Sequence, residues 1–264
     1  MKPVTLFIVS LLAGAAGVGL YLYLKPVPEL GPAITPAPPE LASAPAVQPP
    51  PLAPLPARFL AEERARRRLA PDDASLTVCA ELADAQGTLL ALCDEDDASR
   101  AEGGRVDLYQ LAEPTGPGEP VAVAARLEGI ESGGFGQPGA VRPIRLGAHA
   151  PGFVVEEGQT AQGYSVGTRS LFALVDGAWR PLARLRSHLD NSGSGECGRD
   201  RAACVELDFS LSVDAHAPPS GALPALLVAV DGTEAGRRVS RRYTLRYDAR
   251  RGAYAVPAAL ERTF

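Results

Sequence analysis

Residues 163–167 read Gly-Tyr-Ser-Val-Gly and match the Gly-x-Ser-x-Gly pattern of serine hydrolases. In those enzymes the serine occupies a sharp turn between a strand and a helix, which exposes its hydroxyl as a nucleophile. Here the residues that follow, 170–175, are typical of a strand, so the usual context is missing. A triad in hydrolase order can still be written as Ser165, then Asp190 or Asp208, then His216. Hydrolysis at Ser165 is therefore an alternative function rather than the expected one.

A second group of oxygen-bearing side chains, in residues 190–196, resembles the start of a calcium-binding loop, with a glycine at its sixth position. The twelfth position, which needs a carboxylate that binds through both oxygens, is Arg201. Calcium assistance to a structural subunit of an envelope complex is therefore kept only as an alternative, and no metal ligand is assigned. The acidic run at 94–97 is a second oxygen-rich loop. The residues proposed as binding candidates are Asp190, Asn191, Ser192, Ser194 and Glu196.

The chain contains three histidines, a residue type that commonly binds metals or transfers protons: His149, His188 and His216. Residues 148–151 and 215–218 both read Ala-His-Ala-Pro, so two of the histidines occupy equivalent turns. A structural role explains this repetition better than a metal site does. No cofactor is expected from these residues.

Four cysteines form two local pairs, Cys79 with Cys93 and Cys197 with Cys204. The first pair flanks a turn signal, Asp-Ala-Gln-Gly at 84–87, so the two residues would face each other in a β-hairpin. The second pair brackets a short polar loop. Neither spacing matches the zinc-binding motifs, in which about two to four residues separate the cysteines. We expect two disulfide bonds, and hence an oxidising compartment.

Residues 1–25 are expected to form a transmembrane anchor. No charged residue occurs from Pro3 to Leu24, and those 22 residues would span about 33 Å as a helix, enough for a bilayer core. The alternative is a cleaved signal peptide, but its apolar region is ordinarily shorter. The flanking charges nearly balance, so the predicted disulfides decide the direction. They favour a cytoplasmic N-terminus and a body that is periplasmic or extracellular.

Residues 26–57 are rich in proline and alanine, which favours an extended linker. Residues 58–70 are expected to form a short arginine-rich helix, with acidic side chains early and basic ones late. Its arginines fit a solvated helix face, or contact with anionic lipid or with an acidic partner.

Residues 71–264 are expected to form an all-β domain, because short apolar runs alternate there with Gly, Asp and Pro turns. The runs repeat about three times, each time as four strands. Each unit would be an antiparallel sheet, and the units would bury each other's faces in a propeller-like, prism or sandwich arrangement. The expected strands are 75–82, 88–93, 106–111 and 120–127; 142–146, 153–157, 170–175 and 179–185; and 205–213, 223–230, 242–247 and 254–256.

The charge of the β region excludes one class of partner. Residues 1–70 carry seven basic and four acidic side chains of the chain's 26 and 31, which leaves 19 and 27 for the rest, a net charge of −8. An acidic domain repels phosphate backbones, so no nucleic acid is expected. We expect a non-enzymatic, membrane-anchored binding or scaffold module outside the cytoplasm. Its partner would be a protein or cell-envelope component, bound through the loops at 129–139 and 187–201, which should lie at one end of the domain.

Overall fold

The computed structural model describes residues 53–85, 87–95, 103–114, 116, 119–147, 150–214 and 223–261. The predicted anchor, residues 1–25, and nearly all of the predicted linker, residues 26–57, lie outside this set. Within the described residues, no helix has the length and apolarity that a membrane crossing requires. Residues 51–264 group into one compact unit.

This unit is built mainly from antiparallel strands, which confirms the expected all-β class. Its first sheet contains β1 (Leu76–Asp84), β2 (Gly87–Asp94), β3 (Gly104–Ala112) and β4 (Ala122–Ser132). Its second sheet contains β5 (Val141–Arg145), β6 (Pro151–Ala161), β7 (Tyr164–Val175), β8 (Ala178–Asp190), β9 (Val205–Val213), β10 (Leu226–Glu234) and β11 (Arg237–Leu245). A small hairpin pairs β12 (Tyr247–Asp248) with β13 (Ala253–Tyr254). The described helices are α1 (Leu55–Arg66), α2 (Gly195–Arg199), η1 (Arg201–Ala203) and η2 (Ala258–Leu260).

The predicted division into three separate sheets needs a correction. The first predicted unit does form its own sheet, β1–β4. The second and third units are joined instead, because β8 pairs with β9 over three residue pairs that run from His188↔Asp208 to Asp190↔Glu206. The strand expected at 254–256 is the short β13, which pairs with β12 and not with β11.

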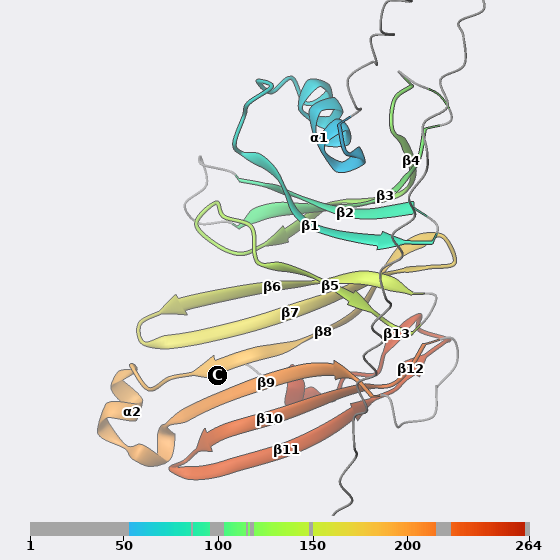
Figure 1. Ribbon diagram of the computed structural model, residues 1–264. Coiled ribbons are helices and arrows are strands. Elements are labelled where there is room, and N and C mark those ends of the chain that lie inside the picture. The colour runs from blue at the N-terminus through green and yellow to red at the C-terminus, as the bar shows by residue number, and fades with distance from the viewer. Residues whose placement is uncertain are drawn as a thin grey trace, which may run out of the picture. The chain divides into compact units, whose positions relative to one another are not determined.

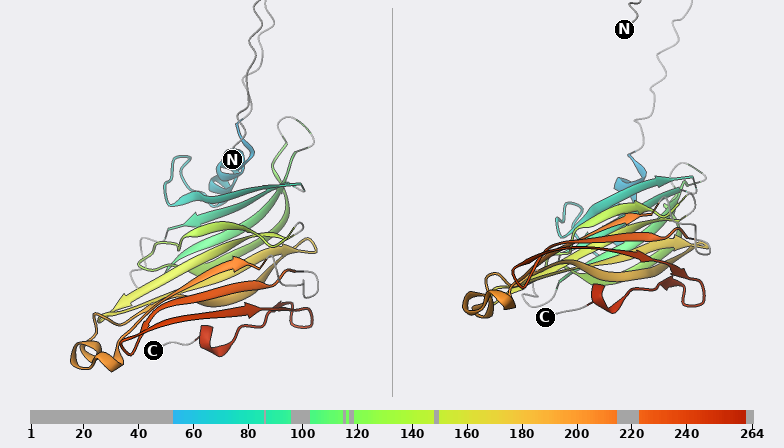
Figure 2. Two further views of the ribbon diagram at one scale, coloured as in Figure 1. Left: turned by 60° about the horizontal axis from the view of Figure 1, so that its bottom comes forward. Right: turned by 90° about the horizontal axis from the view of Figure 1, so that it is seen from below.

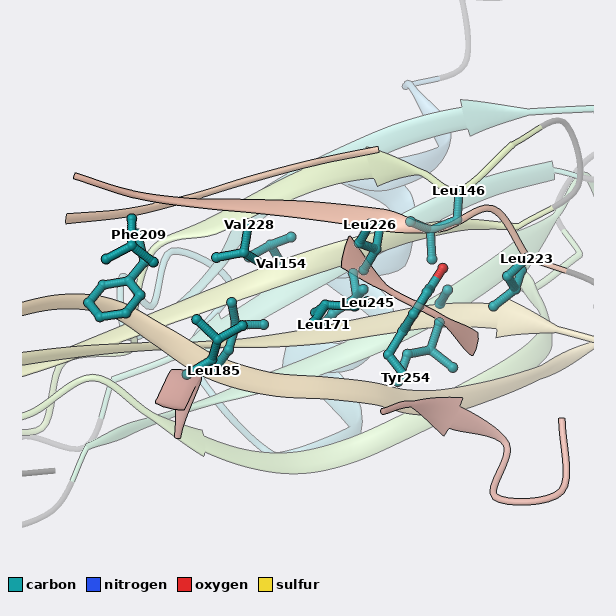
Figure 3. Packing of buried hydrophobic residues seen from close by; sticks show 14 of the residues in the cluster. Leu146, Val154, Leu171, Leu185, Phe209, Leu223, Leu226, Val228, Leu245 and Tyr254 are labelled. Carbon is teal, nitrogen blue, oxygen red and sulfur yellow. The ribbon is translucent and has the colours of Figure 1, made fainter. Parts of the chain in front are cut away.

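The three groups of strands nevertheless stack as layers. On β6 and β7, Phe153 and Phe172 join a core with β2 and β3 of the first sheet. Their chain neighbours Val154 and Leu171 point to the opposite face and join a core with β9–β11 (Figure 3). The left view of Figure 2 shows the layers in chain order, from the blue α1 to the red β11. Because these parts of β6 and β7 are buried on both faces, residues 153–155 and 171–175 are continuous apolar runs, whereas the remainder of both strands is more polar.

Helix α1 covers the remaining face of the first sheet. Phe59 is buried and meets Tyr109 edge-on, with ring centroids 4.8 Å apart. Burying a phenylalanine contributes about 2–3 kcal/mol, so this contact holds the helix firmly to β3. The helix begins at Leu55, three residues before the predicted start at 58.

The arginines of α1 bind the protein's own carboxylates. Arg67, just after the helix, lies 2.9 Å from Asp94 and 2.5 Å from Asp107, which are on β2 and β3. Arg66 lies 2.6 Å from Glu63 of the same helix and 3.1 Å from Glu128 on β4. The hydrogen bond to Glu63 raises the pKa of Arg66. Burial lowers the pKa of Arg67, but the hydrogen bond and charge of Asp107 outweigh burial and raise it overall. These two side chains therefore fasten the helix to the sheet.

Both predicted disulfide bonds are present. Cys79 bonds to Cys93 with 5.7 Å between their Cα atoms, and Cys197 bonds to Cys204 with 4.6 Å. The first bond crosses the hairpin β1–β2, whose register places Asp84 opposite Gly87 as the turn signal predicts.

Candidate functional site

The two loops that the sequence predicts as binding sites lie at the same end of the domain (Figure 1). Strands β4 and β8 run in the same direction, so the β4–β5 loop and the β8–β9 loop with α2 leave at that end. Gly139 of the first region and Ser187, the first residue of the second, line one hollow of about 380 Å³, and Ser187 lies on β8. The structure therefore brings the two predicted regions together.

The β4–β5 loop, residues 133–140, carries an exposed aromatic ring and is called the Phe135 loop below. Phe135 is 80% exposed, whereas Val123, the other exposed large hydrophobic residue among those described, is 41% exposed. Most other large apolar side chains of the described residues pack into the cores. The Phe135 ring is therefore the most prominent apolar feature on the described surface.

The backbone of the Phe135 loop forms a tight turn in an unfavourable conformation. Gly134 and Gln137 exchange two backbone hydrogen bonds of 3.0 Å. Phe135 and Gly136 between them have φ angles of 56° and 77°, as in a type I′ turn. The first of these positions favours asparagine, aspartate or glycine. A bulky residue there costs about 1–2 kcal/mol.

The base of the loop is anchored at several points. Gly139 N–H donates to Ser132 Oγ at 3.1 Å, and Ala140 accepts from the Glu156 backbone at 2.8 Å. A Cβ atom at Gly139 would lie 1.8 Å from the carbonyl oxygen of Glu156, so only glycine fits this close approach. Gln137 also donates to Glu95 at 3.1 Å. The ring thus projects from a well-supported base.

A cavity of about 450 Å³ with both apolar and charged lining residues includes Gly133 of the loop. Glu157 on β6 accepts hydrogen bonds from Thr168 and from Arg184. Arg186 is only 4% exposed, and burial together with the nearby charge of Arg184 lowers its pKa. The cavity therefore presents charged and hydrogen-bonding groups next to the apolar ring.

The β8–β9 loop uses several of its predicted binding residues to shape itself. Asn191 is 3% exposed, donates to Ala203 O at 2.8 Å and accepts from Val205 N–H at 2.7 Å. Ser194 is equally buried, and its hydroxyl accepts from Cys197 N–H at 3.2 Å, capping α2.

The remaining predicted residues of this loop lie nearer its surface. Asp190 ends β8 and accepts from the Ser192 N–H at 2.7 Å. Ser192 and Glu196 are exposed. Among the described residues, no group of three His, Cys, Asp or Glu side chains could hold a metal ion. Asp96 and Asp97 of the second oxygen-rich loop lie outside the described residues.

Ser165 lies in strand β7, where its hydroxyl oxygen is 3.0 Å from that of Thr160. Its cross-strand partner on β8 is Asp190. The histidine that lines the same hollow as Ser165 is His188, whose Nδ1 lies 2.8 Å from Asp208. His149 and His216, the latter the base expected from the sequence, lie outside the described residues.

The sequence singled out the Phe135 loop as a region but missed the ring itself. A single aromatic residue between glycines, in Gly-Gly-Phe-Gly, was the available signal. Comparison with known protein families, with characterised proteins and with solved structures finds no match to this chain. The function is therefore inferred from the geometry of these residues.

Proposed function

We propose that this protein is a membrane-anchored binding module outside the cytoplasm, and that it binds a protein partner by burying Phe135. The observation that carries this proposal is an 80% exposed phenylalanine held at a positive φ. Exposure forgoes about 2–3 kcal/mol of burial energy, and the backbone conformation costs about 1–2 kcal/mol more. Strained, exposed side chains of this kind occur at binding sites, where aromatic anchors contribute a large share of the affinity.

The surroundings of the ring indicate what the partner surface must offer. An apolar pocket would receive the ring, and a basic rim would suit Glu95 and Glu131, which flank the loop. The charged and polar side chains in the cavity beside Gly133 can hydrogen-bond a neighbouring segment of the partner. A protein surface fits better than an anionic membrane, because residues 71–264 carry a net charge of −8.

The location is part of the same proposal. Two disulfide bonds suit an oxidising compartment, and the apolar run at 1–25 with the proline-rich linker at 26–57 would tether the body at a distance from a membrane. Such a tether confines the search for a partner to the cell envelope.

A photo-crosslinking experiment tests the binding site. A photoreactive phenylalanine analogue replaces Phe135 in the full-length protein, in membranes of the organism that makes it, and in a control protein it replaces Arg180 on β8. We expect a specific crosslinked partner at 135 that is absent at 180. Added unlabelled protein should compete the crosslink away, whereas the Phe135→Ala protein should not. Equal competition by both proteins would contradict the proposal.

Hydrolysis remains a second candidate, because Ser165 and His188 line one hollow and Asp208 binds the imidazole. With Nδ1–H donating to Asp208, Nε2 is the nitrogen available to accept the serine proton, as in a serine hydrolase. The test is ester hydrolysis with p-nitrophenyl acetate. Ser165→Ala should abolish any measured turnover and Thr160→Ala should retain it. Equal turnover by the wild-type protein and Ser165→Ala would dismiss this candidate.

A further inference from the structure

Strand β11 forms one edge of the seven-stranded sheet (Figure 1). It pairs with β10 from Arg237 to Leu245, and no other described strand pairs with it. Among the described residues, the outer side of β11 thus has no strand partner. An open edge of this kind is a template for an additional strand.

Arginines are concentrated on this edge and in the residues that follow it. All are exposed: Arg237, Arg238, Arg241, Arg242, Arg246, Arg250 and Arg251. Arg241 is bound to Glu234 at 2.7 Å, and Arg251 lies 3.5 Å from Asp248. The other five form no ion pair with any residue that the structure describes. Positive charge is thus concentrated along one edge of a domain that is acidic as a whole.

The arginines lie on both faces of the strand. Side chains alternate along a β-strand, so Arg238 and Arg242 share one face, while Arg237 and Arg241 share the other. The second face is also that of Tyr243, which packs on the core. A flat charged surface laid against the sheet would meet only one of these rows. A strand added at the edge, in the plane of the sheet, would place its own alternating side chains beside both.

We propose that the edge of β11 binds an extended acidic segment of a partner protein by strand addition. The backbone of the segment would pair with β11, and its carboxylates would meet the arginines on both faces. Two copies of this chain do not suit each other at this edge, because pairing one β11 with another would bring like charges into register. This surface is separate from the Phe135 loop, so it adds a second contact to the proposed binding module.

The probe is a ten-residue peptide in which Glu-Glu and Val-Val pairs alternate, so that an extended backbone presents carboxylates on both faces. A peptide with Lys in place of Glu is its control. Binding to the full-length protein in detergent micelles is measured by fluorescence anisotropy at two salt concentrations. We expect the acidic peptide alone to bind, and more weakly at high salt. The double variant Arg238→Ser/Arg242→Ser should weaken binding at least about fivefold, given about 0.5–1 kcal/mol for each charge pair.

A matched control removes the same charge elsewhere. Arg126 and Arg180 are exposed residues on β4 and β8, so Arg126→Ser/Arg180→Ser should change the affinity less than about twofold. Circular dichroism and thermal melting establish that both double variants are folded. Equal weakening by the two double variants would overturn the proposal, since it would show a general charge effect.

Hydrogen exchange distinguishes strand addition from simple charge attraction. Amides of β11 that point away from β10 should exchange more slowly when the acidic peptide is bound, while those of β5, at the opposite edge, should not change. Peptide binding without this protection would overturn the proposal. So would tighter, arginine-dependent binding to phosphatidylglycerol vesicles than to the peptide, which would identify a lipid surface as the occupant instead.

Discussion

Two glycine-rich loops at the same end of the domain use their side chains in opposite ways. The β8–β9 loop is also rich in polar residues, whereas the Phe135 loop, Gly-Gly-Phe-Gly-Gln-Pro-Gly-Ala, contains one polar side chain. In the first, the Asn191 and Ser194 side chains are buried and bonded to the loop's own backbone. In the second, the main chain supplies the turn and Phe135 extends into solvent. The polar side chains that suggested a binding site thus serve in part to shape their own loop, whereas the Phe135 ring remains exposed.

The strongest test of this difference is Asn191→Ala. The buried amide bonds to Ala203 and Val205, so its removal leaves two backbone groups without partners. We expect the free energy of unfolding to fall by about 2–4 kcal/mol, measured by urea denaturation. Ser192→Ala, at an exposed neighbour, serves as the control and should change it by less than about 0.5 kcal/mol. Equal effects would show that Asn191 does not shape the loop.

Removing the Cys197–Cys204 bond should have a somewhat smaller effect. The bond closes a short loop, and replacing both cysteines with serine should cost about 2 kcal/mol through the added freedom of the unfolded chain. Thermal melting of the double variant measures the loss. Crosslinking at position 135 should persist in this variant, because the Phe135 loop is anchored to β4 and β6 instead. Loss of the crosslink would show that the two loops depend on each other.

A substitution in the Phe135 loop should instead raise the free energy of unfolding. Phe135→Asn creates Asn-Gly, the preferred pair for a type I′ turn, and should stabilise the protein by up to about 1 kcal/mol. The same variant should lose the specific partner. Urea denaturation and the competition assay measure the two effects, with Val123→Asn as a surface control. A destabilised Phe135→Asn protein would show that the ring supports the fold.

The smallest expected effect concerns calcium. Because Asn191 and Ser194 already bond within the loop, millimolar calcium should shift the melting temperature by less than about 1 °C. Magnesium at the same concentration controls for ionic strength. A calcium-specific rise of several degrees would restore the view of residues 190–196 as a metal site.

Local patterns in the sequence predicted the features that depend on neighbouring residues. The hairpin between Cys79 and Cys93 follows from its turn signal, and most strands follow from short apolar runs. Contacts between distant residues were not accessible in this way. The three residue pairs that join β8 to β9 leave no periodic signal, so the second and third units looked separate. The partners of Arg67 are 27 and 40 residues away in the chain, so the sequence favoured a solvated helix face, with an external partner as the alternative.

The candidate site was predictable only as a region. The range 129–139 was identified because a glycine-rich loop followed a strand, which is a statement about position. Nothing in the residue types distinguished Phe135 from a core residue. Its proposed role rests on two quantities that depend on the fold, the exposure of the ring and the sign of φ.

The contacts between α1 and the first sheet also determine how a force applied to the chain is distributed over the domain. The segment before Leu55 enters the body through this helix, so tension on it reaches the sheet through Phe59 and Arg67. Arg67 holds Asp94 and Asp107, which belong to the two inner strands of that sheet and not to its edges. If residues 1–25 are the predicted anchor, a load from the membrane is shared by strands with neighbours on both sides. The force would then not act first on an edge strand. We expect the domain to resist mechanical unfolding at the point where the predicted linker joins α1.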